Sequence, residues 1–420
     1  MKGFNIKLKK ESLNREIISN TKMIYKLLSI ILILIIFNNF YICSLKINIE
    51  NDKNEDILKK RNLFFYTDAN IDDIIALQSI LSNDSEFKLR GICVSGTGFT
   101  TRAIGLDTIF KVFNFMTEKD NDRYKELLSI PVALGSSIPL DSALNFEISI
   151  LNATNNQVRA LGDTLWYTKD QYFNNNTNGL VPTNMSCTEL FVKINKELLE
   201  LNEPIEILSA GPATDLAILL TLYPNVVDNI ELVSQMGGTI DAPANIFTYR
   251  NNTVAEFNLF VDIKAFQIMV SSLGPKLLLT PLDATDTNPI TKDFFYNEIN
   301  KPLTYSGQWL QALFTSVKNI ITDASFFNID HIEGQGFYIW DFESYRVLLN
   351  RNCDEELIEQ IEINDSNSPN NPSGQITLSS ASSSSSSSSS SILNKTRICT
   401  YINSNSSHSL LSNIYKYKLP

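Results

Sequence analysis

Residues 63–73 read Leu-Phe-Phe-Tyr-Thr-Asp-Ala-Asn-Ile-Asp-Asp, an apolar run that ends in three acids and one amide. The apolar and aromatic start predicts a buried strand over Leu63–Thr67. Such a strand delivers the three carboxylates and the amide to one turn at its carboxyl end. Because open α/β sheets bind their ligands at that edge, we expect the functional site there.

Strand-like and helix-like segments alternate from Arg61 to about Leu349, a range that includes this stretch. The βαβ rhythm predicts an α/β fold with a mostly parallel, Rossmann-like central sheet and helices on both faces. Strands are expected at Leu63–Thr67, Leu89–Val94, Pro131–Leu134, Ile205–Ser209, Ile230–Gln235 and Lys276–Thr280. Helices are expected at Asp72–Ser82, Arg102–Met116, Cys187–Leu199, Pro212–Leu222 and Ile263–Ser272.

The acidic turn predicts a site for a hard cation. Its three carboxylates repel one another unless a cation shares them. Oxygen ligands with no His or Cys nearby favour calcium or magnesium over zinc. The alternative is that Asp72 and Asp73 only favour a helix N-terminus, but this leaves Asp68, at the end of an apolar run, unexplained.

Length and composition limit the class of protein. With 420 residues, 43% of them hydrophobic, the chain predicts one large globular domain, which we place at residues 60–420. A formal net charge of -11 argues against nucleic acid as a partner, because binding phosphates requires clustered Lys and Arg. The five cysteines form no CxxC, so neither a zinc site nor a dense disulfide framework is expected. Cys93 is interpreted as a core residue, and an oxidised pair among the others is left open.

The N-terminus predicts entry into the secretory pathway. Residues 1–26 are strongly basic, and the apolar run Leu27–Phe37 follows. We interpret residues 1–46 as a signal peptide or signal anchor, with cleavage favoured because the pure apolar run is short for a bilayer. A buried core helix is the alternative. The catalytic body would be secreted or membrane-anchored, and a glycoprotein is expected from sequons at Asn83, Asn152, Asn175, Asn184, Asn251, Asn364, Asn394 and Asn405.

Near the C-terminus lies a serine tract, residues 379–391, which cannot bury apolar surface and is predicted to be a disordered loop. The segments on either side, Gln375–Leu378 and Thr396–Ile402, are both strand-like. We therefore predict a C-terminal hairpin interrupted by the serine loop. A linker to a second domain is the alternative.

The acidic turn resembles the signature D-x-D-x-x-x-D-D of the inosine-uridine type nucleoside hydrolases. Its variant Asp68-Ala-Asn70-Ile-Asp72-Asp73 looks like the purine-preferring branch. Further segments similar to the family follow in the family's order: Leu208-Ser-Ala210-Gly-Pro-Ala-Thr214-Asp215, Met236-Gly-Gly238 with Asn245, Glu256-Phe-Asn258 with Asp262, and Tyr338-Ile-Trp340-Asp341. The resemblance covers about Leu63 to Leu349 and implies the nucleoside hydrolase fold.

The resemblance also implies an activity, hydrolysis of the N-glycosidic bond of ribonucleosides. Calcium would be held by Asp68, Asp73, Asp341 and the backbone carbonyl of Ala210. Calcium lowers the pKa of a bound water, and Asp68 would take the proton as the water attacks the anomeric carbon. The substrate would be contacted by Asn70, Asp72, Met236, Asn245, Glu256, Asn258 and Trp340. The alternatives are an ordinary polar loop for Asn245, Glu256 and Asn258, and core packing for Met236.

The departing base needs a proton or an equivalent, and the sequence offers two candidates. His331 lies in a loop that could contact a bound nucleoside, although a solvated loop residue is the more ordinary interpretation. Trp340 stands where many relatives carry His, immediately before the last calcium aspartate. An indole there is expected to stack on the base and raise its basicity, with a buried core tryptophan as the alternative.

The chain also departs from the family pattern. Tyr66 replaces the first aspartate of the signature, which puts metal affinity in doubt. The loop Gly96-Thr-Gly98-Phe99 lacks the acid or amide that some relatives place there, and no tryptophan occurs near Asn145–Ile150 to partner the base.

Two other functions are open from the sequence. A haloacid-dehalogenase-like phosphatase is disfavoured because its nucleophilic aspartate would fall at Tyr66. A non-catalytic nucleoside-binding protein would keep the ribose contacts but lose the acids. The expected partner is thus a nucleoside substrate, with membrane contact only through the N-terminal segment, and we expect a homodimer.

Overall fold

The computed structural model describes residues 60–82, 85–117, 121–140, 180–246, 252–299, 304, 306–311, 338–365, 373–379 and 395–418. By its contacts the chain divides into Met1–Lys59 and Lys60–Pro420. All described residues belong to the second unit, which carries the acidic turn.

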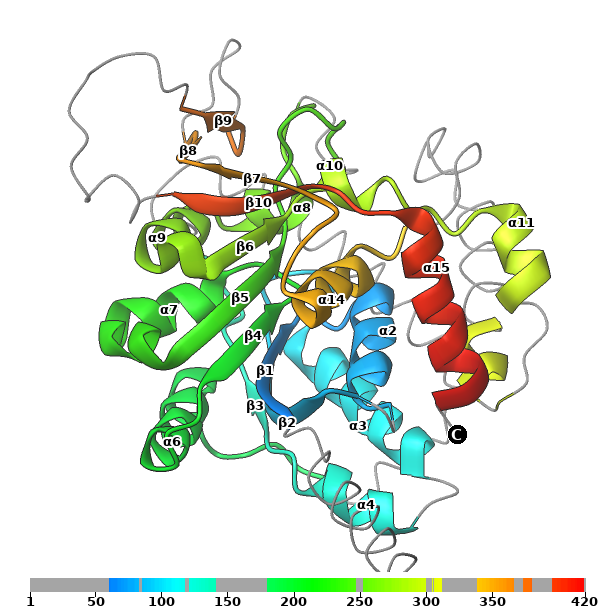
Figure 1. Cartoon of the computed structure of the whole chain (residues 1–420). Coiled ribbons are helices and arrows are strands. Elements are labelled where there is room, and N and C mark those ends of the chain that lie inside the picture. Colours follow the sequence, from blue (N-terminus) through cyan, green and yellow to red (C-terminus); the bar gives the residue numbers. More distant parts are fainter. Residues whose placement is uncertain are drawn as a thin grey trace, which may run out of the picture. The chain divides into compact units, whose positions relative to one another are not determined.

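An eight-stranded sheet forms the centre of this unit, in the order β3-β2-β1-β4-β5-β6-β10-β7 (Figure 1). Each neighbouring pair is parallel except β10 and β7, which are antiparallel. The strands are β1 (Arg61–Thr67), β2 (Phe87–Val94), β3 (Val132–Leu134), β4 (Ile205–Ser209), β5 (Ile230–Met236), β6 (Leu277–Thr280), β7 (Glu355–Glu359) and β10 (Thr396–Tyr401). A separate antiparallel pair consists of β8 (Ile361–Ile363) and β9 (Ile376–Leu378).

Helices cover both faces of the sheet, with α6, α7 and α9 on one side and α2, α3 and α14 on the other (Figure 1). Their bounds are α2 (Ile71–Ile80), α3 (Arg102–Thr117), α4 (Asn121–Leu128), α6 (Cys187–Glu200), α7 (Thr214–Leu222), α8 (Phe257–Val261), α9 (Ile263–Leu273), α10 (Leu282–Thr285), α11 (Lys292–Phe294), α14 (Trp340–Asn350) and α15 (Ser404–Asn413). Short 3-10 turns occupy η2 (Pro224–Asn229) and η3 (Gly274–Lys276), and π-helical turns occupy η4 (Phe295–Ile299) and η6 (Ile414–Lys418).

The side chains of β1 explain why it is an inner strand of the sheet, covered on both faces. Leu63 and Phe65 point into the core shared with α2, α3 and α14, whereas Phe64 and Tyr66 point into the core shared with α6 and α7. Because successive side chains of a strand point to opposite faces, a continuous apolar run fits only a strand that is covered on both. The predicted α/β fold, with its mostly parallel sheet and helices on both faces, is confirmed.

The strand order reverses at β1. The chain runs outward from β1 through β2 to β3, then returns to β4 on the other side of β1 and continues through β5 and β6. The carboxyl ends of β1 and β4 therefore flank the point of reversal, where ligands of open α/β sheets bind. All six predicted strands and all five predicted helices are found, with boundaries that differ by at most two residues at either end.

The predicted C-terminal hairpin is wrong. β9 pairs with β8, and β10 is inserted between β6 and β7 in the main sheet. The apolar Ile398 of β10 is fully buried beside β6, which gives this segment a place inside the core. A long serine tract between two strands does not determine whether they pair with each other, since it can connect strands of two different sheets as easily as neighbours in one sheet. Of the tract itself, only Ser379 lies within the described residues.

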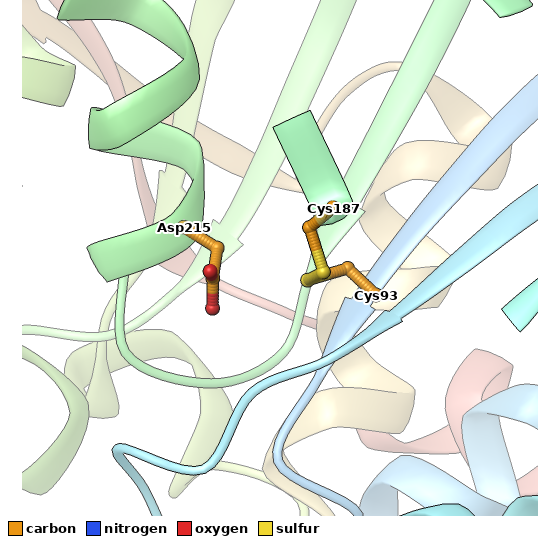
Figure 2. Close-up of side chains that lie close together, drawn as sticks. All are labelled: Cys93, Cys187 and Asp215. Atoms are coloured by element: carbon orange, nitrogen blue, oxygen red, sulfur yellow. A yellow bond between two sulfur atoms is a disulfide. The ribbon is translucent and has the colours of Figure 1, made fainter. Parts of the chain in front are cut away.

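Two disulfides correct the interpretation of the cysteines. Cys93 of β2 is bonded to Cys187, the first residue of α6, and is not a simple core residue (Figure 2). Cys353 is bonded to Cys399 of β10. Each bond joins segments that are distant in sequence, so the pairing could not be read from cysteine spacing. Although Asp215 lies beside Cys93 and Cys187, both sulfur atoms are committed to the disulfide, so this group offers no thiolate to a metal.

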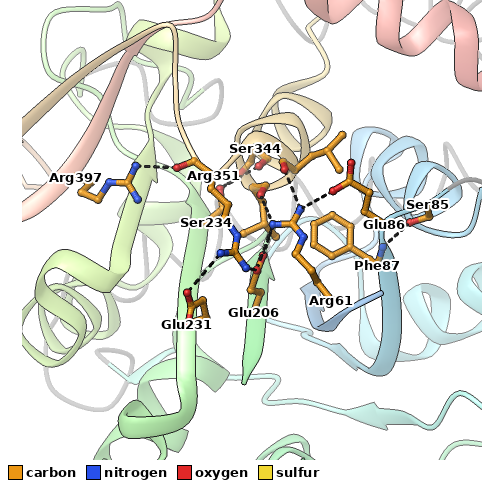
Figure 3. A network of polar contacts seen from close by, with 12 residues as sticks. Arg61, Ser85, Glu86, Phe87, Glu206, Glu231, Ser234, Ser344, Arg351 and Arg397 are labelled. Atoms are coloured by element: carbon orange, nitrogen blue, oxygen red, sulfur yellow. Dashed lines mark hydrogen bonds and ion pairs between the residues drawn. The ribbon is translucent and has the colours of Figure 1, made fainter. Parts of the chain in front are cut away.

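An ion-pair network around the buried Glu206 lies at the amino ends of β1 and β4, away from the acidic turn (Figure 3). The carboxylate of Glu206 receives the guanidinium of Arg61 at 3.2 Å and that of Arg351 at 2.5 Å. Arg61 also donates to the carbonyl of Leu349 at 2.8 Å, near the end of α14. Only the Glu206 side chain is fully buried, and its bonds to the two arginines tie the starts of β1 and β4 to the C-terminal end of α14. The N-terminal end of the same helix carries Trp340 and Asp341.

Several predictions fall on residues outside the described ranges. They are the N-terminal signal segment, His331, most of the serine tract, Cys43, and the sequons at Asn83, Asn152, Asn175, Asn251 and Asn394. Of the sequons within the described ranges, Asn184 and Asn405 are exposed and Asn364 is half-buried. Among the helices of the described residues, none has the length and apolarity needed to cross a membrane.

Candidate active site

The turn between β1 and α2 is held by a tight set of local hydrogen bonds. Asn70 caps α2, and Asp73 accepts the backbone N–H of Asn70 at 3.0 Å, so the two form a capping box. The other oxygen of Asp73 accepts the hydroxyl of Thr67. Ala69 adopts a φ of 58°, a conformation that non-glycine residues rarely take and that is often found at functional sites. The structure therefore confirms that Asp73 helps to cap α2.

Asp73 also belongs to a cluster of buried carboxylates. Asp72, Asp73 and Asp341 each offer an oxygen, and these atoms all lie within 4.8 Å of one another. The three residues are at most 3% exposed. The backbone N–H of Asp341 donates to Asp72 at 3.3 Å, which joins the start of α14 to the start of α2. Acids almost 270 positions apart in sequence thus meet at one end of the sheet.

The electrostatics of the cluster call for a cation. Burial raises the pKa of Asp341 and Asp73 well above the ordinary value and that of Asp72 to about 7, with the neighbouring acids raising each further. Oδ1 of Asp72 and Oδ1 of Asp341 are buried and find no hydrogen-bond donor within the described part of the chain. Buried carboxylates are costly unless paired or bound to a metal. Three clustered carboxylates, two of them with an unsatisfied oxygen, fit a hard cation such as calcium, which takes carboxylate ligands.

Asp68 lies beside this cluster without being one of its three closest members. Its Oδ2 accepts the backbone N–H of Phe99 at 2.7 Å, and its charge contributes to the raised pKa of Asp73. Gly98 makes room for it, because a Cβ at that position would come within 1.9 Å of Asp68 Oδ2. The loop that lacks an acid or amide side chain therefore supports Asp68 through its backbone.

The predicted metal set was Asp68, Asp73, Asp341 and the carbonyl of Ala210. The structure brings Asp73 and Asp341 together and adds Asp72, which the sequence placed among the ribose contacts. Ala210 follows β4 and donates its N–H to the carbonyl of Tyr66 at 3.0 Å, so it lies at the same edge. The individual ligand assignments remain predictions.

Tyr66, where the family carries an aspartate, is buried in the core on the α6 and α7 side. Its ring centroid lies 5.0 Å from that of Phe64. Burial, reinforced by the charge of Asp215, raises the pKa of its hydroxyl well above the ordinary value. A neutral phenol thus replaces a possible carboxylate below the acidic turn.

A polar group predicted to contact ribose gathers after β5. Glu256 caps α8 and accepts backbone N–H groups from Asn258, Leu259 and Gly238 at 2.8 to 3.0 Å. Asn258 donates its side-chain amide to the sulfur of Met236 at 3.3 Å, and Asn245 accepts the N–H of Phe257 at 2.7 Å. Four residues predicted to contact ribose therefore lie together after β5: Met236, Asn245, Glu256 and Asn258.

Glu256 predicts a measurable pH dependence of stability. Burial raises its pKa from 4.5 to about 7, in spite of its three backbone donors. Because the folded-state pKa is the higher one, this group's stabilising effect is complete below about pH 4.5 and is lost as the pH rises through 7. We expect Glu256→Gln to flatten the stability profile between these values by up to about 1.4 kcal/mol per pH unit.

The measurement is the free energy of unfolding in urea, taken in chelator at a series of pH values. Glu200→Gln, the same change at an exposed acid near the end of α6, is the matched control and should follow the wild type. An unchanged slope in Glu256→Gln would show that Glu256 is ionised in the folded protein throughout this range.

Two functional candidates were missed by the sequence analysis, Asp283 and Asp286 in and after α10. Asp286 accepts the indole N–H of Trp340 at 2.7 Å. Asp283 accepts the backbone N–H groups of Ile240, Asp241 and Ala242 at 2.8 to 3.1 Å, and so holds the loop that leads to Asn245. Their signal was present, since acids that follow the apolar strand β6 repeat the pattern that singled out Asp68.

Comparison with known proteins gives one consistent family. A family model described as inosine-uridine preferring nucleoside hydrolase matches residues 63–388. The chain is 25% identical over 321 residues to Nucleoside hydrolase 3 of Arabidopsis thaliana, covering 66% of this chain and 34% of that protein. It is 33% identical over 129 residues to the non-specific ribonucleoside hydrolase RihC of Klebsiella pneumoniae, covering 31% of this chain and 40% of the relative. The matched regions thus span less than half the length of either curated relative.

Solved structures show the same fold. A plant nucleoside hydrolase, the PpNRh1 enzyme, superimposes with a TM-score of 0.65 and 16% sequence identity, covering 85% of this chain and 99% of the other. At this identity the match bears on the fold alone.

Proposed function

Because the chain belongs to the inosine-uridine preferring nucleoside hydrolase family, we propose that it hydrolyses the N-glycosidic bond of ribonucleosides to free base and ribose. One observation carries the proposal, the buried group of Asp72, Asp73 and Asp341 at the carboxyl edge of the sheet, with Asp68 beside it. Acids brought together from both ends of the domain, at the point of strand reversal, are placed for chemistry, since the core gains nothing from their repulsion.

Calcium is the proposed cation, and Asp68, Asp73, Asp341 and the carbonyl of Ala210 are its proposed ligands. The all-oxygen donor set and the two unsatisfied carboxylate oxygens support this choice. Asp72 lies in the same group, with Oδ1 available to the cation or to a ribose hydroxyl. When bound, calcium would supply Lewis-acid chemistry by lowering the pKa of a nearby water.

Asp68 is the proposed general base. Its Oδ2 is oriented by the N–H of Phe99, and its second oxygen can accept a proton from the attacking water. The water oxygen forms a bond to the anomeric carbon while the bond from that carbon to the base nitrogen breaks. The base leaves with the electron pair of that bond and needs a proton from solvent or from a nearby group.

The acids and amides around the ribose would stabilise the transition state. Positive charge develops on the sugar as the base departs, and Glu256, Asn245 and Asn258 supply oxygens at the end of β5. These groups are already fixed by backbone hydrogen bonds, so they need no reorganisation during the reaction. We propose them, with Asp72, Asn70 and Met236, as the ribose-binding side of the site.

A purine is the proposed base. Trp340 is half-buried immediately before Asp341 and presents a large aromatic surface at the same edge of the sheet. Stacking on an indole would favour the larger ring system of a purine and make it easier to protonate.

We also propose that the protein acts in the secretory pathway or outside the cell. The two disulfides support this location, because such bonds persist in oxidising compartments. Anchoring or release by the N-terminal segment, and the homodimer, remain predictions. Fractionation of tagged protein and sedimentation of the purified chain would test them.

The test is a ribose-release assay with inosine, guanosine, adenosine and uridine, each with calcium and with excess chelator. We expect release from the purine nucleosides that is abolished by chelator and restored by calcium. Nucleoside that binds without releasing ribose would point instead to a non-catalytic binding protein. Failure to release ribose from any of the four in the presence of calcium would overturn the proposal.

A further inference from the structure

Trp340 is held by two neighbours, Asp286 and Tyr338, of which Asp286 lies in none of the family-like segments above. Its indole N–H donates to Oδ1 of Asp286 at 2.7 Å. The ring of Tyr338 stacks on the indole with 5.7 Å between centroids and an angle of 10° between planes. A hydrogen bond in the plane of the ring and a stacking partner above it together fix the orientation of the indole.

Asp286 is itself held firmly. Asp286 is the C-cap of α10, the short helix after β6, and its backbone N–H donates to the carbonyl of Leu282. The next residue, Thr287, donates its hydroxyl to the carbonyl of Ile402 at 3.0 Å, beyond the end of β10. The acceptor of the indole bond is therefore part of the rigid edge of the sheet and is no free surface side chain.

The placement of the indole connects it to the acids. Trp340 is the first residue of α14, and Asp341 follows it with an N–H bonded to Asp72. Because Tyr338 covers one face of the indole, at most the opposite face is left for a ligand. A base bound at the site could stack on that face only.

Charge also bears on the chemistry. Burial raises the pKa of Asp286 to about 6, with Asp283 adding to the rise and the bond from Trp340 opposing it. The group is thus largely ionised at neutral pH. An indole that donates to a carboxylate gains electron density in its ring, and the faces of aromatic rings attract cations. A purine that acquires a proton as it leaves is such a cation.

We propose that Asp286 is a positioning residue for catalysis, which fixes the indole of Trp340, backed by Tyr338, so that it stacks on a purine leaving group and favours its protonation. The inference rests on the proposed nucleoside hydrolase function and adds to it a determinant of base preference. Asp286 touches neither the base nor the acids and acts through Trp340.

Two substitutions of Asp286 distinguish the contribution of its hydrogen bond to Trp340 from those of its charge and its packing. Asp286→Leu keeps the branched shape and the number of side-chain heavy atoms but removes the acceptor, whereas Asp286→Asn keeps an acceptor oxygen and removes the charge. Asp293→Asn is the matched control, since it makes the same change at an exposed acid of α11. All are measured in the full chain with calcium present.

We expect Asp286→Leu to lower kcat/KM for inosine by roughly tenfold or more, as for the loss of a hydrogen bond to a charged group. Most of the loss should be in kcat, because protonation of the base is completed in the transition state. Uridine should be affected less, since a pyrimidine offers a smaller stacking surface. Asp286→Asn should be intermediate, and Asp293→Asn unchanged.

A double-mutant cycle with Trp340→Phe tests whether Asp286 acts through the indole. In the Trp340→Phe background, Asp286→Leu should cause no further loss with inosine. An equal loss in both backgrounds, or an equal loss with inosine and uridine in the Trp340 enzyme, would overturn the proposal.

A spectroscopic measurement separates this inference from the activity itself. In protein labelled with 15N-tryptophan, the indole N–H of Trp340, assigned with Trp340→Phe, should exchange slowly with solvent in the wild type and rapidly in Asp286→Leu. If the wild type releases ribose from no nucleoside, the proposed function fails. In that case the catalytic part of the role fails with it, and the positioning of the indole for base stacking stands if Asp286→Leu speeds this exchange and weakens inosine binding, and fails if both are unchanged.

Discussion

Asp68→Asn should lower kcat by roughly 100- to 10,000-fold, the usual contribution of a general base. The substitution keeps the shape of the side chain and can keep the bond from the N–H of Phe99, but the amide cannot take a proton from water. Asp68 is 2% exposed and closely surrounded, with Gly98 and Gly211 leaving just enough room for it. The loss should therefore appear without unfolding, and inosine hydrolysis at saturating substrate measures it.

The control is Asp228→Asn, an exposed acid in the turn before β5 at the opposite edge of the sheet, which should hydrolyse inosine at the wild-type rate. Inosine binding to Asp68→Asn, followed by calorimetry, should persist within a few fold. If Asp68→Asn keeps more than a tenth of the wild-type kcat, Asp68 is not the base.

Asp341→Asn should abolish the stabilisation that calcium confers. Ligand that binds only the folded state at about 100 times its dissociation constant stabilises by about 2.7 kcal/mol, so chelator should lower the wild-type Tm by a few degrees. Asparagine at this position keeps one amide oxygen but removes a negative charge from the cation site, so the variant's Tm should respond little to calcium. Differential scanning calorimetry with calcium and with chelator makes the comparison.

The change in stability that Asp341→Asn causes in the absence of calcium tests the cation site more directly. Like-charged buried groups destabilise the fold, so removing one of three should leave the chelated variant at least as stable as the chelated wild type. An ordinary core mutation would instead be destabilising in both conditions. A wild type whose Tm ignores calcium, or a variant that responds to it equally, would contradict a cation site at Asp72, Asp73 and Asp341.

Some elements could be predicted from the sequence and others could not, for physical reasons. β1, β4 and α6 could be predicted because a buried strand or an amphipathic helix shows its environment in its own residue pattern. The sequence also predicts β9 and β10 as strands, but the predicted pairing between them is wrong. The residues of a strand do not show which strand it pairs with when a long loop separates the two.

The same distinction applies to the site. Asp68, Asp72 and Asp73 stand in one turn and could be found together from sequence, and Asp341 was joined to them only through the family resemblance. The partner of Trp340 was missed, because Asp286 belongs to another βα turn that approaches the indole only in the folded chain. Cys93 and Cys187 are likewise 94 positions apart and meet only after β2 and α6 have packed.

By itself, then, the residue pattern determined the alternation of strands and helices, the burial of β1 and the acidic turn at its end. These are local properties, since they depend on periodicity and on residues within one or two turns of the chain. Tertiary structure alone decided the disulfide pairs, the insertion of β10, the approach of Asp341 to Asp72 and the bond from Trp340 to Asp286. Each of these joins distant segments, and such contacts are set by how the helices and strands pack, which no short stretch of sequence contains.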